Sequence, residues 1–159
     1  MEPSSVLFLH QAEDNLPFIT QAKIELDLIL ELNNSAKTGA EVIFVGKIRN
    51  VNNDKEVLKL SYECHIEMAN CMILNILNES IEKFNLEFAY AQHRVGELSI
   101  GDKAIVVLVQ GKHREQSFDA CRFIVDKIKF DVPIWKKEYW KDGTSNWGDN
   151  FGQNFSLNK

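Results

Sequence analysis

The chain has 159 residues, enough for one domain with a sizeable core, and its 45% hydrophobic and 26% charged residues are ordinary for a globular protein. A net charge of −5 argues against general nucleic-acid binding, which needs a basic face. No apolar run approaches the roughly 20 residues that cross a bilayer and no secretory signal opens the chain, so we expect a cytoplasmic protein with no membrane or nucleic-acid partner.

Residues 1–150 are expected to form a single domain, and residues 151–159, at the Asn- and Gly-rich end of the chain, a loose C-terminal tail. Within the domain, residues 6–10 predict a short strand. Residues 22–33 predict an amphipathic helix, because four apolar side chains there follow helical spacing: Ile24, Leu28, Ile29 and Leu32.

Residues 40–50 are rich in β-branched and aromatic side chains and predict a strand. Residues 52–55 predict a turn, so residues 57–65 are expected to pair antiparallel with that strand. Residues 67–84 predict a helix and residues 88–95 another strand. The apolar stripe expected on this helix is Met68, Cys71, Met72, Ile76, Ile81 and Phe84.

A strongly apolar strand is predicted at residues 104–110, a helix at 115–130 and a final strand at 134–140, released by Pro133. The expected buried stripe of the helix is Phe118, Cys121, Ile124, Val125 and Ile128. This order of strands and helices predicts an α+β domain built on antiparallel sheet.

Positive charge is concentrated in residues 112–141, which hold 8 of the 18 Lys and Arg but 5 of the 23 Asp and Glu. This window has a net charge of +3 and the remainder −8. An acidic protein that gathers cations in one place is suited to bind a small anion there.

Lys129 and Lys136 are the candidates for catalysis. Lys129 falls in the last turn of its helix, where a cation also stabilises the helix dipole without any catalytic role. Lys136 follows seven residues later across the proline turn. If both side chains entered one cleft, each would lower the pKa of the other, which would make a lysine available as nucleophile or base.

Other cations are candidates for holding an anion. His113 and Arg114 lie between a strand and a helix N-terminus, where free N–H groups and a bidentate guanidinium favour phosphate. Lys47 and Arg49 alternate along a strand and so share a face. The alternative for each pair is an ordinary solvated strand end.

Cysteine chemistry has less support. Cys64, His65 and Cys71 do not have the spacing of a zinc site, so no metal and no cofactor is expected. Cys71 and Cys121 fall on apolar stripes and are expected to be buried, which disfavours a thiolate nucleophile.

Taken together, these motifs resemble the large, catalytic subunit of molybdopterin synthase over about residues 39–148. The resemblance rests on short runs that occur in the same order: Gly39-Ala40, Phe44-Val45-Gly46-Lys47-Ile48-Arg49-Asn50, Tyr62-Glu63, His93-Arg94-Val95-Gly96-Glu97-Leu98, His113-Arg114, Ile128-Lys129 and Pro133-Ile134-Trp135-Lys136-Lys137-Glu138.

The resemblance implies an α/β-hammerhead-type domain with a small α+β subdomain. It implies a homodimer whose copies each bind a small ubiquitin-like subunit with a C-terminal Gly-Gly thiocarboxylate. Sulfur passes from that tail to cyclic pyranopterin monophosphate, giving the dithiolene of molybdopterin. Carried over by position, the catalytic residues are Lys129 and Lys136, and the substrate-binding residues are Lys47, Ile48, Arg49, His113, Arg114, Lys137 and Glu138. A non-catalytic module that binds a partner's tail is the alternative.

Overall fold

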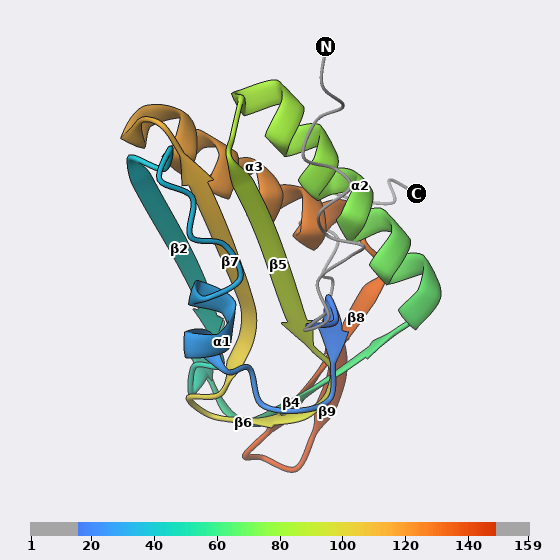
Figure 1. Ribbon diagram of the computed structural model, residues 1–159. Coiled ribbons are helices and arrows are strands. Elements are labelled where there is room, and N and C mark those ends of the chain that lie inside the picture. The colour runs from blue at the N-terminus through green and yellow to red at the C-terminus, as the bar shows by residue number, and fades with distance from the viewer. Residues whose placement is uncertain (1–15, 149–159) are drawn as a thin grey trace, which may run out of the picture.

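The structure is a computed structural model that describes residues 16–148, which form two sheets and three helices (Figure 1). The predicted α+β fold with antiparallel sheet is confirmed. The strand predicted at residues 6–10 and the tail at residues 151–159 lie outside the described residues. None of the helices in the described range combines the length and apolar character needed to cross a membrane.

The first sheet has the strand order β1-β5-β7-β2, and β1 is the strand that runs parallel to its neighbour. Its members are β1 (Ile19–Thr20), β2 (Ala40–Lys47), β5 (Phe88–Arg94) and β7 (Lys103–Gly111). Helices cover both faces: α2 (Ile66–Phe84) and α3 (Arg114–Asp131) on one, and α1 (Leu26–Leu30) on the other (Figure 1). This double coverage explains why β7 is apolar almost throughout.

The second sheet centres on one long strand, β4, which pairs antiparallel with three others. Its members are β3 (Val51–Asn52), β4 (Lys55–Cys64), β6 (Gly96–Ser99), β8 (Ile134–Trp140) and β9 (Ser145–Gly148). A two-residue turn joins β3 to β4. Both turn residues, Asn53 and Asp54, have positive φ (49° and 61°), as in the turns that match the twist of a hairpin.

The connection from α3 to β8 fixes where both candidate lysines lie. Val132 is extended (φ −77°, ψ 129°) because Pro133 excludes helical backbone from the residue before it. Both Val132 and Ile134 are buried in the main core, which anchors this short link at both ends. The predicted helix and final strand are confirmed here, and Lys129 and Lys136 are held by a tight, packed turn.

Two predictions about the first half of the chain were wrong. The helix expected at residues 22–33 spans five residues, Leu26–Leu30, and Leu28 is half exposed. Residues 57–65 pair with β8 rather than with the strand at 40–47. That strand already pairs with β7 along its length, and a register shift after Gly46 turns the chain away, so β4 meets the two-residue β3 instead.

The predicted apolar stripes were partly wrong. Met68 and Phe118 are 51% and 61% exposed, and Cys71 is an exposed thiol on α2. On α2 the face that packs is rotated from the expected one, whereas on α3 the predicted residues Cys121, Ile124, Val125 and Ile128 are buried. Small residues such as Ala69 and Ala120 are also fully buried where the helices approach the sheet. Burial raises the pKa of the Cys121 thiol to about 11.

Candidate active site

Lys129 is exposed in the last turn of α3, where its side chain lies near the end of the first sheet. Its Nζ is 5.8 Å from the centre of the Phe44 ring on β2. The positive charge of Lys129 also reaches His93 on β5, where it adds to the lowering of the imidazole pKa. The ammonium group therefore lies beside an aromatic and imidazole surface built by two strands.

Lys136 lies on β8 and pairs with a carboxylate rather than facing the second lysine. Its Nζ is 3.0 Å from Oε1 of Glu138, whose residue is only 6% exposed. The same oxygen accepts a hydrogen bond of 2.6 Å from Nδ2 of Asn52 on β3. Asn52 in turn accepts from the Arg49 guanidinium at 3.3 Å. Three of the predicted site residues, Arg49, Lys136 and Glu138, are thus joined in one polar chain.

Tyr62 and His93 link the surroundings of the two lysines. Tyr62 is the register partner of Lys136, so both side chains lie on the same face of the second sheet. The Tyr62 ring meets the His93 ring edge-on at 4.9 Å between centres. Burial, with a smaller contribution from the nearby Glu138 carboxylate, raises the pKa of Tyr62 to about 12. The phenol therefore stays protonated. The Tyr62 and His93 rings form a wall, with Lys136 paired opposite Tyr62 and Lys129 near His93.

His93 is buried and its ring orientation is fixed. Nδ1 lies 2.8 Å from the carbonyl oxygen of Arg94; because a carbonyl only accepts, Nδ1 carries the proton. Burial lowers the pKa of His93 to about 4, opposed by the bond to the Arg94 carbonyl and assisted by Lys129. The imidazole is therefore neutral at pH 7.

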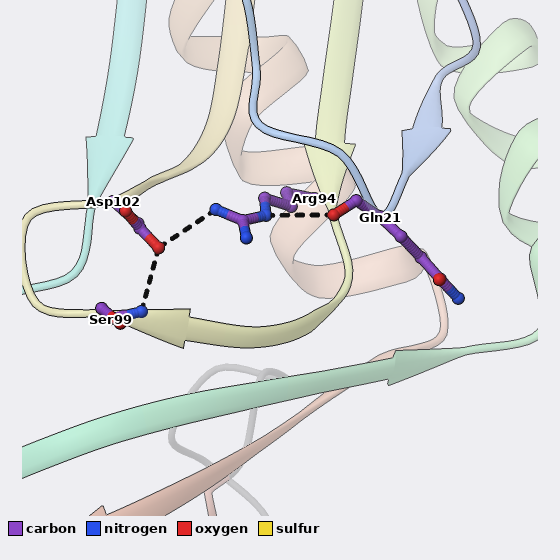
Figure 2. A network of polar contacts seen from close by, with 4 residues as sticks. All are labelled: Gln21, Arg94, Ser99 and Asp102. Atoms are coloured by element: carbon purple, nitrogen blue, oxygen red, sulfur yellow. Dashed lines mark hydrogen bonds and ion pairs between the residues drawn. The ribbon is translucent and has the colours of Figure 1, made fainter.

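Arg94, the next residue along the chain, belongs to a polar network that Figure 2 shows. Its guanidinium donates from Nη1 to Oδ2 of Asp102 at 3.0 Å and from Nε to the Gln21 carbonyl at 3.3 Å. Oδ2 of Asp102 also accepts from the backbone N–H of Ser99 at 3.0 Å. The network joins the end of β5, the β6–β7 turn and the segment after β1.

Three predicted substrate-binding residues lie away from this cluster or point elsewhere. Lys137 faces the opposite side of the second sheet, where Nζ is 5.2 Å from the Tyr139 ring centre and 5.5 Å from that of Trp147. Ile48 is buried in the core between the sheets, and its backbone N–H and carbonyl bond to Asp102 and Gly101. Lys47 is exposed at the end of β2.

His113 and Arg114 lie at the other end of α3 from Lys129. His113 is the N-cap residue and Arg114 the first helical residue, and both are exposed. Fifteen residues of α-helix separate Arg114 from Lys129, a distance of about 22 Å at 1.5 Å per residue. Within one chain, the structure does not bring these two groups together.

Sequence reasoning missed three residues of the cluster as site residues: Asn52, Tyr62 and His93. Asn52 was interpreted as a turn residue, and it directly precedes the two-residue turn. Nothing in its neighbours along the chain indicates contact with a carboxylate 86 residues away.

The structure offers no candidate metal site: within residues 16–148, no three His, Cys, Asp or Glu side chains are grouped so that they could hold an ion.

Comparison with known proteins gives consistent matches. The model of the MoaE protein family matches residues 19–131. A molybdopterin synthase catalytic subunit from Pyrococcus abyssi is 43% identical over 114 residues, 72% of this chain and 77% of that protein. The crystal structure of molybdopterin synthase from Staphylococcus aureus matches with a TM-score of 0.77 at 33% identity, covering 82% of this chain and 94% of that one.

A third match shares the fold at lower identity. It is a chain in a complex of subunits 1 and 2 of molybdopterin-converting factor from Helicobacter pylori, with a TM-score of 0.67 and 19% identity. The match covers 82% of this chain and 88% of that one.

Proposed function

The chain belongs to the MoaE protein family, and from this membership we propose that it is the catalytic subunit of molybdopterin synthase. It transfers sulfur from the thiocarboxylated C-terminus of a small carrier subunit to cyclic pyranopterin monophosphate. A cytoplasmic location is part of the proposal and is supported by three cysteines that are all free thiols.

Lys129 and Lys136 are proposed as the catalytic residues. The observation that supports this assignment best is that both lie beside the uncharged wall of Tyr62 and His93, although they come from different elements. The substrate phosphate and the thiocarboxylate are both anions, and two cations beside one uncharged surface attract them more strongly than a single cation in open water does. Lys129 acts as nucleophile or as general base, and Lys136 holds the anionic group in place.

A complete site is proposed to need two copies of the chain. His113 and Arg114 suit a phosphate group but lie about 22 Å from Lys129 along α3. In a symmetric dimer whose α3 helices run antiparallel, the N-terminal end of one helix can lie beside the C-terminal end of the other. The phosphate-binding pair of one copy would then complete the lysine site of its partner.

The test is single-turnover product formation by Lys129→Ala, with Lys127→Ala as the matched control. Lys127 lies two residues earlier on the same helix, is partly exposed and pairs with Asp131. Losing a group that moves a proton or forms a bond costs roughly 10²-fold or more. We therefore expect Lys129→Ala to lose that much dithiolene formation and Lys127→Ala to retain nearly all of it, with unchanged affinity for the small subunit.

Equal turnover in the two variants would show that Lys129 has no catalytic role. If well-folded wild-type protein bound the small subunit and yielded no dithiolene, the chain would be a non-catalytic module that holds the partner's tail.

A further inference from the structure

Asn52 occupies a position that the hairpin makes rigid. It is the last residue of β3 and pairs with Lys55 across the two-residue turn. The two turn residues both have positive φ, which sets the twist of the hairpin and so the direction of the Asn52 side chain. The side chain reaches away from the turn to a carboxylate on β8.

The amide of Asn52 joins a cation to an anion. Its Nδ2 donates to Oε1 of Glu138 at 2.6 Å, and its Oδ1 accepts from the Arg49 guanidinium at 3.3 Å. A carboxylate accepts and a guanidinium donates, so the two neighbours together fix which way the amide is turned. Neither an aspartate nor an apolar side chain of similar size could serve both neighbours.

Glu138 depends on this contact. It is a buried carboxylate whose Oε1 receives one bond from Asn52 and one from the Lys136 ammonium at 3.0 Å. A buried charge that loses a donor either turns toward its remaining partner or draws in water. Without the amide, the position of the Lys136 ammonium relative to Glu138 is no longer fixed from the β3 side.

We propose that Asn52 is a positioning residue of the sulfur-transfer site, which sets Arg49 and the Lys136–Glu138 pair in one geometry. The inference rests on the proposed function, because Arg49 and Lys136 matter to the reaction only if this site performs it. Asn52 acts through its neighbours and is not assigned contact with the substrate.

The experiment compares steady-state sulfur transfer by wild type, Asn52→Ala and the control Asn53→Gly. Asn53→Gly removes an amide at the next position, while glycine accepts the positive φ of 49° found there. For Asn52→Ala we expect kcat to fall roughly 10-fold and KM for the pterin to rise about 3-fold, because small misplacements of catalytic groups are costly. The control should match wild type, and all three should share one melting temperature within a few degrees.

A double-mutant cycle then separates positioning from general weakening. If Asn52 acts through Glu138, the combination of Asn52→Ala with Glu138→Gln loses no more kcat/KM than the worse single variant. Losses in kcat/KM that multiply would show that Asn52 acts independently of Glu138. Unchanged kinetics for Asn52→Ala would show that Asn52 has no role. Either result would overturn the inference and leave the proposed function standing. Absence of sulfur transfer by wild type would overturn the proposed function and the inference with it.

Discussion

His93 couples the protonation of one buried ring to the stability of the whole fold. Its pKa is about 4 in the folded chain, and its reference value is 6.5. As the pH falls below 6.5, the unfolded chain therefore takes up the proton first, and folding loses stability until the folded pKa is reached. The difference of about 2.5 pKa units corresponds to about 3 kcal/mol.

The prediction is that His93→Gln, which cannot titrate, removes this dependence. Wild type should lose most of that 3 kcal/mol of unfolding free energy between about pH 7.5 and about pH 4.5, and the variant should lose much less. Urea unfolding at the two pH values measures both slopes. His113→Gln, at an exposed imidazole, should behave like wild type. Equal slopes for His93→Gln and wild type would contradict a buried, neutral His93.

The elements are held in register by contacts that sequence alone could not reveal. The helices at 66–84 and 114–131 and the strands at 88–94, 103–111 and 134–140 were predictable because periodicity, a glycine turn or Pro133 marks them. The long-range partner of β4 was not, since β8 lies far along the chain and any apolar strand could have paired there. The two lysines could be proposed from short motifs along the chain. The contacts of Asn52, Tyr62 and His93 join distant segments, so they become visible only in the folded structure.

The Arg94–Asp102 pair joins three such elements and yields a test at this scale. The Ser99 N–H, with help from the Arg94 guanidinium, holds the pKa of Asp102 below its usual range. The carboxylate therefore stabilises the fold above pH 3.8, its ordinary pKa, and this contribution is lost as the pH falls through the lower folded value.

We expect Asp102→Asn to lower the unfolding free energy by about 1 kcal/mol at neutral pH, because a neutral amide cannot form the ion pair with Arg94. The difference from wild type should shrink in acid, as wild-type Asp102 also becomes neutral. Chemical unfolding at both pH values tests this, with Asp119→Asn on the exposed face of α3 as the comparison. A constant difference at all pH values would point to lost packing instead of lost charge.

At the scale of the whole molecule, the two ends of α3 predict which chains supply each active site. Lys129→Ala and Arg114→Ala should each be inactive alone, because each defect affects both sites of a dimer. After subunit exchange, a mixed dimer contains one site with both defects and one with neither. With half of the dimers mixed, about a quarter of wild-type activity should return.

Activity after mixing the two variants at equal concentration is the measurement. Mixing Lys129→Ala with Lys136→Ala is the matched control. Those two lysines lie beside the same wall of one chain, so every site in that mixture keeps a defect. No recovery in the first mixture, despite demonstrated exchange, would place Arg114 outside the partner's site.

The cluster around the lysines can form only after distant segments of the chain have come together during folding. Asn52 and Glu138 are separated by 86 residues, and the rings of Tyr62 and His93 come from different sheets. Helices form within microseconds, whereas contacts between distant segments form late because loop closure opposes them. A newly made chain can therefore acquire its helices long before its two sheets dock, and the rings of Tyr62 and His93 meet only at that docking step.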